Sequence, residues 1–240
     1  LMTLLQDLSL LLMLDNFEHL APAAPLIVDL LASCPSLTLL VTSRAPLHVS
    51  GEQRFPVQGL ALPDPESAAL SDIAGSSAVQ LFVTRAQMVE PGFALTGENA
   101  SALAELCRRL DGIPLALELA AARLSLLPVP ELLQQLSPAL ALLTDGPRDH
   151  PPRLRTMADA ITWSYDLLSP VDQTLFRRLA VFSGGCPLTA IEQMADPDSG
   201  IDPLDHVDAL VEQSLLHAIP AAGGEPRFAM LETVREYASE

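Results

Sequence analysis

Two short apolar runs, each ending abruptly in polar residues, dominate the pattern at the start of the chain. Residues 10–14, LLLML, are followed by Asp15, and residues 37–41, LTLLV, are followed by Thr-Ser-Arg. Continuous apolar runs of this length are typical of strands buried on both faces of a parallel sheet. Residues 18–32, between them, have the pattern of a helix with prolines near its start. The sequence therefore predicts a βαβ unit with a right-handed crossover.

The polar residues after these runs are the first candidates for a binding site. In open parallel sheets, ligands bind beyond the carboxyl ends of the strands. Asp15 and the segment Thr42-Ser43-Arg44 are expected to lie at that edge. On the local pattern alone, a strand that simply ends in a polar residue explains Asp15 equally well.

Helical spacing of apolar residues prevails from residue 76 to about residue 140. One helix is expected to begin at Thr96, a good N-cap, and to end near Leu110, where Gly112 stops it. Pro114 then opens another helix from its first turn, where proline is favoured. The pattern predicts a small helical bundle in this part of the chain.

A polar, proline-rich stretch at residues 145–155 is expected to be an interdomain linker. Beyond it, helices are expected over residues 156–167, from Ser169 as N-cap, and over residues 203–213. Residues 215–219 and 227–231 then read as two strands of a hairpin around the turn PAAGGEP. Helices followed by a hairpin are the order of a winged-helix domain.

The charge of the chain argues against a broad DNA-binding face. Thirty acidic residues stand against thirteen basic ones, all of them arginine, and the formal net charge is −17. Affinity for nucleic acid comes largely from neutralising phosphates, which such a surface repels. Direct DNA binding by this segment is therefore not expected.

Cysteine usage and hydropathy exclude further classes of protein. Cys34, Cys107 and Cys186 are odd in number and far apart, so they indicate neither a zinc site nor a disulfide framework. Reduced thiols in a cytoplasmic protein are the expectation. The apolar runs are all too short to span a bilayer.

The order of five segments along the chain resembles a known protein family more specifically than any single segment does. LLMLDNFEHL, LLVTSRAPLHVSGEQRFPVQGL, LDGIPLALELAAARL, TMADAITWSYDLLSPVDQTLFRRLAVFSGGCPL and RFAMLETVREYA follow one another along the chain. In this order they resemble the nucleotide-binding module of STAND signalling ATPases. The resemblance is to the NB-ARC-like ATPases of bacterial LuxR-type and AfsR-type transcriptional regulators.

The resemblance implies a fold that is α/β at first and mostly α afterwards. Residues 1–65 would be the C-terminal part of a P-loop NTPase parallel sheet, the nucleotide-binding domain. Residues 66–144 would be a helical domain with the GxP motif, and residues 156–240 a winged-helix domain. No G-x-x-x-x-G-K-[ST] motif occurs and the chain has no lysine. The P-loop is therefore expected upstream of residue 1.

The family's functional residues carry over as follows. Asp15 matches the Walker B acid, which holds Mg²⁺ through its water shell. The next position, often acidic in relatives, is Asn16, so Glu18 is the candidate second catalytic acid. Arg44 matches the arginine that senses the γ-phosphate, and a guanidinium suits phosphate oxygens.

Two further motifs of the resemblance lie in the helical part of the chain. Gly112 and Pro114 match the GxP motif, which packs near the adenine of the nucleotide. Met230, Leu231 and Glu232 occupy the Met-His-Asp motif through which relatives bind ADP. A leucine cannot donate a hydrogen bond to phosphate, so this chain departs from the family there.

The resemblance implies an ATP/ADP-binding regulatory switch in a signal-transducing transcriptional regulator, with ATP or ADP and Mg²⁺ as ligands. The intact protein would be a slow ATPase, the chain alone inactive. Other domains of the same chain, and further copies on activation, would be its partners. The alternatives are a DNA-binding winged-helix transcription factor and an inactive scaffold. The candidate recognition helix, residues 203–213, has three acids and neither arginine nor lysine.

Overall fold

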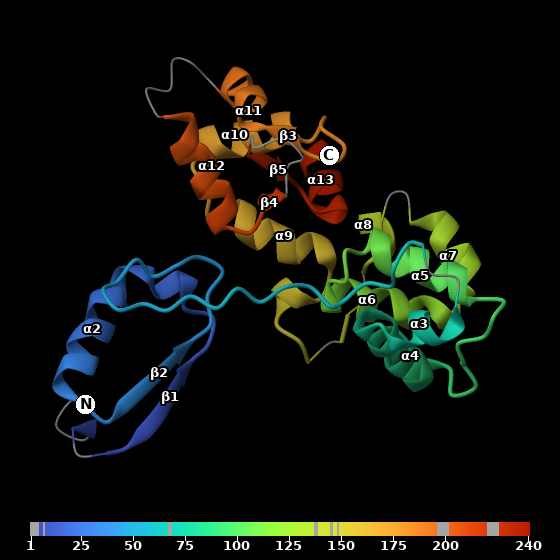
Figure 1. Ribbon diagram of the computed structural model, residues 1–240, viewed down its shortest axis with the longest axis horizontal. Coiled ribbons are helices and arrows are strands. Elements are labelled where there is room, and N and C mark those ends of the chain that lie inside the picture. Colours follow the sequence, from blue (N-terminus) through green and yellow to red (C-terminus); the bar gives the residue numbers. More distant parts are fainter. Residues whose placement is uncertain are drawn as a thin grey trace. The chain divides into compact units, whose positions relative to one another are not determined.

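The computed structural model describes residues 5–6, 8–66, 69–136, 139–144, 146–147, 149–195, 202–219 and 226–240. The chain divides into two compact units (Figure 1). The first unit comprises Leu1–Val57 and Glu212–Ser214, and the second comprises Gln58–Val211 and Leu215–Glu240. Among the residues that the structure describes, no helix combines the length and the apolar character needed to cross a bilayer.

The first unit contains the expected parallel strand pair. β1 (Leu10–Leu14) and β2 (Leu37–Val41) run parallel in the bounds that the sequence predicted, with Leu14 opposite Val41. The single helix predicted between them is instead a 3-10 helix, η1 (Phe17–Ala23), followed by α2 (Ala24–Ser33). Proline disrupts regular α-helix beyond the first turn, so α2 begins only where Pro25 falls within that turn.

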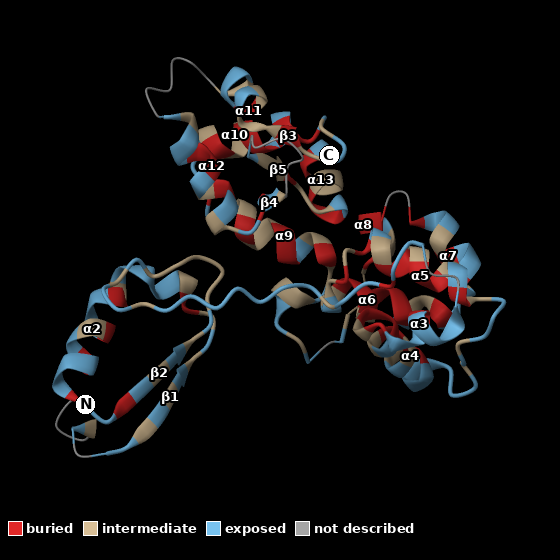
Figure 2. Cartoon of the chain, in the orientation of Figure 1, coloured by how far each residue is buried: buried red, intermediate tan, exposed pale blue. Residues whose placement is uncertain are grey.

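One face of this strand pair is covered and the other is exposed (Figure 2). The covered side packs on α2 through two small apolar clusters, which include the buried residues Ile27 and Leu30. On the other side, Leu11 and Met13 of β1 are 57% and 60% exposed. The prediction of strands buried on both faces is therefore wrong for the described residues, because a single helix covers only one face of a sheet.

The second unit begins with the predicted helical bundle. Phe82, Leu103 and Leu117 are fully buried in its core. Helix α5 begins at Ala100, with Asn99 at the N-cap position, and not at Thr96 as predicted. Thr96 instead belongs to the preceding turn, where its carbonyl accepts the N–H groups of Asn99 and Ala100. The elements are α3 (Leu70–Gly75), α4 (Ser77–Val89), α5 (Ala100–Arg109), α6 (Pro114–Ala122), η2 (Arg123–Ser125), α7 (Val129–Gln135) and α8 (Ala139–Leu142).

The rest of the second unit has the winged-helix order, as predicted. Its three short strands form an antiparallel sheet in the order β3-β5-β4. The predicted hairpin is confirmed in β4 and β5, while residues 220–225 of its turn lie outside the described residues. The elements are η3 (Pro152–Leu154), α9 (Met157–Tyr165), α10 (Pro170–Leu179), β3 (Cys186–Pro187), α11 (Leu188–Met194), α12 (Pro203–Glu212), β4 (His217–Ile219), β5 (Arg227–Ala229) and α13 (Glu232–Ser239).

A single apolar core extends through the second unit. Within the winged-helix part, Tyr237 of α13 lies 5.8 Å from the ring of Tyr165 and 6.5 Å from that of Phe176, centroid to centroid. Val234 and Ala238 of α13 are buried on the same side. Helix α13, for which the sequence pattern gave no prediction, is thus an integral part of the winged-helix core. The opposite side of α13 carries charged residues, among them Glu232 and Arg235.

Candidate functional site

The carboxyl ends of β1 and β2 meet as the sequence predicted. The hydroxyl of Thr42 donates a hydrogen bond to the carboxylate of Asp15 and accepts one from the backbone N–H of Asn16, at 2.9 Å. The N–H of Phe17 donates to the carbonyl of Thr42, also at 2.9 Å. Asn16 turns the chain with φ 60, a left-handed conformation that asparagine tolerates better than most residues. The end of β2 therefore fixes the position of the Asp15 carboxylate.

Glu18 and Arg44, the other two candidates of the first unit, form an ion pair. The Nε of Arg44 lies 3.8 Å from the Oε1 of Glu18, and the glutamate side chain is only 3% exposed. The carboxylate thus turns toward the end of β2 and not into solvent. In this arrangement Glu18 balances the charge of Arg44 and holds its guanidinium beside the strand ends.

The oxygen atoms at the strand ends suit a magnesium ion only in part. Mg²⁺ binds one or two protein carboxylates and completes its octahedron with water and substrate phosphates. Asp15 and Thr42 supply a carboxylate and a hydroxyl of that kind. In the part of the chain that the structure describes, no group of three or more histidine, cysteine, aspartate or glutamate side chains is arranged to hold a metal. Further ligands would have to come from phosphate and water.

Gly112 and Pro114 have structural roles in the second unit. Gly112 adopts φ +64, and a Cβ at this position would lie 2.4 Å from the carbonyl oxygen of Leu60. The N–H of Leu60 in turn donates to the carbonyl of Gly112 at 2.9 Å. Only glycine fits this close approach of two backbone segments. Pro114 occupies the first position of α6, as predicted. Its side chain is exposed.

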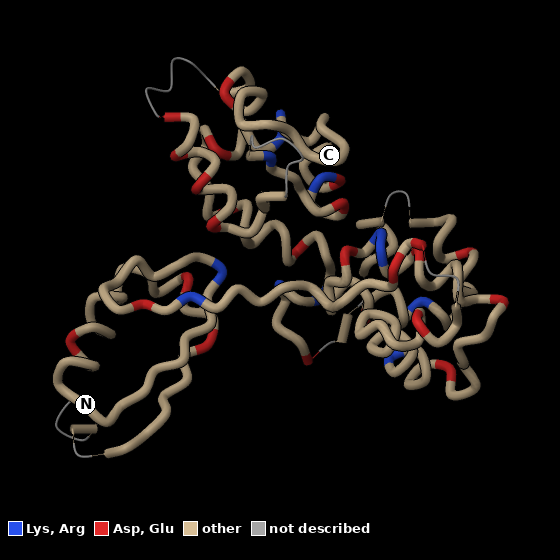
Figure 3. The backbone as a smooth tube through the Cα atoms, in the orientation of Figure 1, with Lys and Arg blue, Asp and Glu red and all other residues tan. Residues whose placement is uncertain are grey.

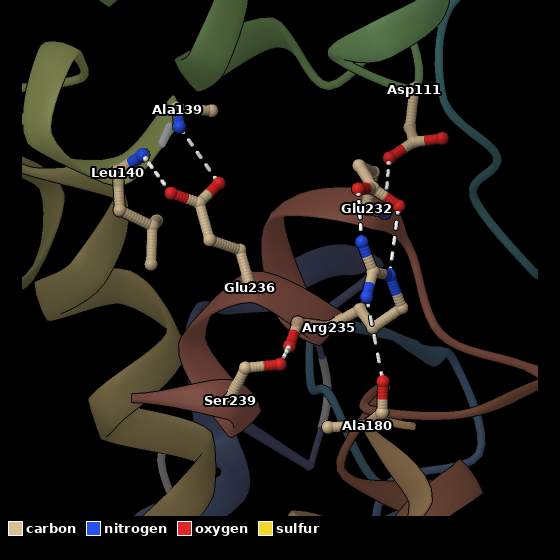
Figure 4. A network of polar contacts seen from close by, with 8 residues as sticks. All are labelled: Asp111, Ala139, Leu140, Ala180, Glu232, Arg235, Glu236 and Ser239. Carbon is tan, nitrogen blue, oxygen red and sulfur yellow. Dashed lines mark hydrogen bonds and ion pairs between the residues drawn. The ribbon is translucent and has the colours of Figure 1, made fainter. Parts of the chain in front are cut away.

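The structure brings the predicted ADP-binding motif next to the GxP segment. The backbone N–H of Glu232 donates to the Oδ2 of Asp111 at 2.9 Å (Figure 4), and Asp111 immediately precedes Gly112. Met230 and Leu231 are half-buried and pack against the apolar core, so position 231 serves packing here. The other candidates, Asp15, Glu18 and Arg44, belong to the first unit.

Sequence reasoning did not select Asp111, although a signal for it exists. The residue has φ 52, and aspartate and asparagine are enriched at such left-handed positions. Burial raises the pKa of the Asp111 carboxyl to about 6; the bond from the N–H of Glu232 lowers it, and the charge of the Glu232 side chain raises it further. Asp111 is thus an acid whose charge is disfavoured where it lies.

Helices α5 and α13 line an open groove of about 620 Å³ in the second unit. Glu105 of α5 binds Arg108 at 2.9 Å and Arg109 at 3.2 Å, and Glu232 of α13 binds Arg235 at 2.5 Å. Burial raises the pKa of Glu105, but the hydrogen bonds from the two arginines outweigh it and lower the pKa overall. The arginines of the groove thus have carboxylate partners within it.

A buried polar cluster attaches α12 to α10 in the winged-helix part. The Nδ1 of His206 lies 2.6 Å from the Oδ1 of Asp172, whose Oδ2 accepts the hydroxyl of Ser169 at 2.5 Å. His206, on α12, is 2% exposed. The opposite side of α12 carries the exposed acids Asp205 and Asp208. The contact fixes the rotation of α12, so that its outward side is acidic.

Acidic residues predominate over the whole winged-helix part. Residues 168–240 contain twelve acidic residues and four arginines. The described acids of this part are distributed over several helices, including α12 (Figure 3). A DNA-reading helix normally presents arginine, lysine or polar side chains to the bases and phosphates. The exposed surface of α12 is acidic, so its charge is opposite to that of a helix that contacts DNA phosphates.

Comparison with known proteins identifies the C-terminal part of the chain. Residues 168–240 match the family described as a winged helix-turn-helix domain. These residues run from the start of α10 to the end of α13 and include all three strands of the small sheet. The order of these elements in the structure agrees with the match.

Similar proteins extend the comparison over nearly the whole chain. Over 235 residues the chain is 43% identical to "Putative HTH-type transcriptional regulator Mb0914c" of Mycobacterium bovis and to "Putative HTH-type transcriptional regulator Rv0890c" of Mycobacterium tuberculosis. The match covers 96% of this chain but 25% of each relative. The chain is also 35% identical over 240 residues to an uncharacterized Mycobacterium tuberculosis protein, of which it covers 58%. The chain has a C-terminal winged-helix domain, and its similarities fit a transcriptional regulator.

Proposed function

We propose that this chain is a control segment of a transcriptional regulator, in which the winged-helix domain works by docking on protein surfaces. The observation that carries the proposal is the orientation of α12. The bond between His206 and Asp172 turns Asp205 and Asp208 outward. This is the helix that a DNA-binding winged helix would insert into the major groove. Its charge suits a protein surface better than a phosphate backbone.

Direct DNA binding is the second candidate, and the family match favours it. Residues 168–240 match a winged helix-turn-helix domain, and such domains commonly read DNA. The similar proteins are also named as HTH-type regulators. The residues available for phosphate contacts in this part are Arg177, Arg178, Arg227 and Arg235. Arg235 is engaged with Glu232, and Arg178 donates to the carbonyl of Met194.

Fluorescence anisotropy with a labelled 30-base-pair duplex distinguishes the two candidates. Docking on protein predicts that the chain binds more weakly than ordinary non-specific binding, whose Kd is about 10⁻⁴ to 10⁻⁶ M. Replacing the two outward acids, in the variant Asp205→Arg with Asp208→Arg, should create salt-sensitive binding. The matched control places arginine at Asp64 and Asp72, two acids far from α12 in sequence. Tight, salt-sensitive binding by the unaltered chain would instead establish the second candidate.

We further propose that ATP or ADP with Mg²⁺ controls the docking in the full-length protein. Support comes from the strand ends, where Thr42 fixes the Asp15 carboxylate and Glu18 holds Arg44. Asp15 would contact the hydration shell of the ion, and Arg44 would attract phosphate oxygens. The magnesium ion would supply charge neutralisation for the phosphates.

Calorimetry with ATP and with ADP, in a full-length protein that includes these residues, tests nucleotide control. Asp15→Asn should weaken Mg²⁺-dependent binding by about 10- to 100-fold, the usual effect of losing a group that orients metal-bound ligands. Asp29→Asn is the matched control, because Asp29 is an exposed acid on α2 of the same unit. Failure to bind either nucleotide would exclude nucleotide control and leave protein docking to be judged by the DNA experiment.

A further inference from the structure

Two carboxylates bridge the helical bundle and the winged-helix domain in opposite directions (Figure 4). Asp111, between α5 and α6, accepts the N–H of Glu232, the first residue of α13, at 2.9 Å. Glu236 of α13 accepts the N–H groups of Ala139 and Leu140, at the start of α8, at 2.8 and 3.1 Å. Each domain thus supplies an acid to the first turn of a helix of the other. We call these contacts the reciprocal caps.

The cap from Asp111 stands in place of a local side-chain cap at α13. The first amides of a helix have no acceptor within the helix, so they need one from elsewhere. Leu231, at the N-cap position of α13, has no side-chain oxygen to offer. The amide of Glu232 therefore depends on Asp111, which lies 121 residues earlier. The protection of this amide reports directly on the contact between the two domains.

The surroundings of Asp111 disfavour its ionised form more than those of an ordinary capping residue do. From α13, the carboxylate of Glu232 faces it, and Glu232 in turn binds Arg235 and is influenced by Arg109 of α5. On its other side, Gly59 and Leu60 pack against residues 111 and 112 and bring no charge. The helix N-terminus favours a negative charge, whereas burial and the Glu232 carboxylate oppose it. The docked arrangement therefore favours a neutral Asp111.

We propose that Asp111 is a charge-sensitive element that sets how tightly the winged-helix domain docks on the helical bundle: docking tightens when Asp111 is neutral and loosens when it is ionised. The two domains also share an apolar core, which includes Val234 and Ala238 of α13, so the charge of Asp111 modulates a contact that apolar packing maintains. This inference needs neither nucleotide nor DNA and does not rest on the proposed function.

The direction of the pH dependence follows from linkage. Docked Asp111 has its pKa raised from 3.8 to about 6, whereas release to solvent returns it toward its ordinary value. The docked state therefore binds more protons between these values, and docking weakens as pH rises from about 4 to 6. Above about pH 6, the stabilisation of docking by protonated Asp111 is lost completely.

Amide hydrogen exchange by NMR on the 240-residue chain tests the inference. The amide of Glu232 reports on the Asp111 cap, and those of Ala139 and Leu140 report on the Glu236 cap. The variant Asp111→Asn keeps a carbonyl acceptor, removes the charge and suits φ 52. The matched control is Asp208→Asn, which removes one exposed acid from α12.

At pH 7.5, Asp111→Asn should protect the Glu232 amide more than the unaltered chain, by up to about a hundredfold, because the two pKa values of Asp111 differ by about two units and each unit is worth a factor of ten. At pH 5.0 the difference should shrink, and Asp208→Asn should change neither value. Equal or lower protection in Asp111→Asn at pH 7.5 would overturn the inference. So would an equal gain in Asp208→Asn.

Two further measurements keep the test independent of one variant. In the unaltered chain, protection of the Glu232 amide, corrected for intrinsic exchange, should fall as pH rises from 5.0 to 7.5. A flat profile contradicts the inference even if Asp111→Asn does not fold. Glu236→Gln keeps one of the two acceptor oxygens, so the amide of Ala139 or Leu140 should exchange faster. Asp111→Asn should instead slow the exchange of the Glu232 amide.

Discussion

Helices α8, α9, α10 and α13 of the second unit receive a side-chain cap at their start, and they do so in two different ways. α9 and α10 begin at Thr156 and Ser169, whose hydroxyls accept the N–H of the residue three positions on, at 2.9 and 3.2 Å. α13 and α8 instead use Asp111 and Glu236, acids 121 and 97 residues away. A local cap stabilises its helix whether or not the domains dock. A distant cap exists only when they dock, so it couples helix stability to domain arrangement.

The largest loss of stability is expected when the polar cluster that extends the local cap of α10 is disrupted. Asp172→Ala removes the carboxylate that binds both Ser169 and the buried His206, and should lower the free energy of unfolding by about 3 kcal/mol. Urea denaturation followed by circular dichroism measures the loss. Asp159→Ala is the matched control, because Asp159 has the same position in α9 but is exposed. A similar loss in both variants would show that the buried contact adds nothing.

The second effect concerns the distant cap of α8. Glu236→Ala removes the acceptor of two backbone N–H groups and should cost about 1.5 kcal/mol, toward the upper end of the range for helix caps. Thermal unfolding of the second unit gives the value. Glu192→Ala on α11, an exposed glutamate, should change it little. If Glu236→Ala is as mild as this control, the distant cap does not stabilise docking.

A smaller loss is expected at a purely local cap. Thr156→Ala leaves the N–H of Asp159 without its side-chain acceptor and should cost about 1 kcal/mol. Unlike Asp111→Asn, it should leave the exchange of the Glu232 amide unchanged. Thr174→Ala, within α10, is the control for loss of a threonine that does not cap. Faster exchange at Glu232 in Thr156→Ala would contradict the separation of local and distant caps.

The smallest effect belongs to the ion pairs within α5. Glu105→Gln removes carboxylate bonds to Arg108 and Arg109 and should cost about 0.5 kcal/mol at pH 7, since these groups are partly exposed. The folded pKa of Glu105 is lowered, so its contribution is present above pH 4.5 and disappears as pH falls below that value. Stability curves of both proteins from pH 3 to 7 measure the difference. A difference that grows on acidification would contradict this sign.

Local pattern was enough to predict much of the fold. Hydrophobic runs predicted the bounds of β1 and β2. Capping and proline chemistry within a few residues predicted Ser169 as the N-cap of α10 and Pro114 as the first residue of α6. The break between η1 and α2 and the start of α5 at Ala100 were missed, because turns and prolines shift helix ends by several residues.

The candidate site was predictable only where its members are consecutive or lie at neighbouring strand ends. Asp15 and Thr42 meet because parallel strands end at the same edge of a sheet. The pairing of Glu18 with Arg44, by contrast, depends on the 3-10 turn after β1. No spacing rule connects Asp111 with Glu232, since their contact depends on how two domains pack.

The sequence by itself determined the parallel strand pair, the winged-helix order and the acidic character of α12, since these depend on composition and on residues a few positions apart. The tertiary structure decided which acids are buried and what they cap. Asp111 and His206 look like ordinary polar residues in the chain. Their environments arise only when segments distant in sequence pack together, because burial and opposing charges are properties of the folded arrangement.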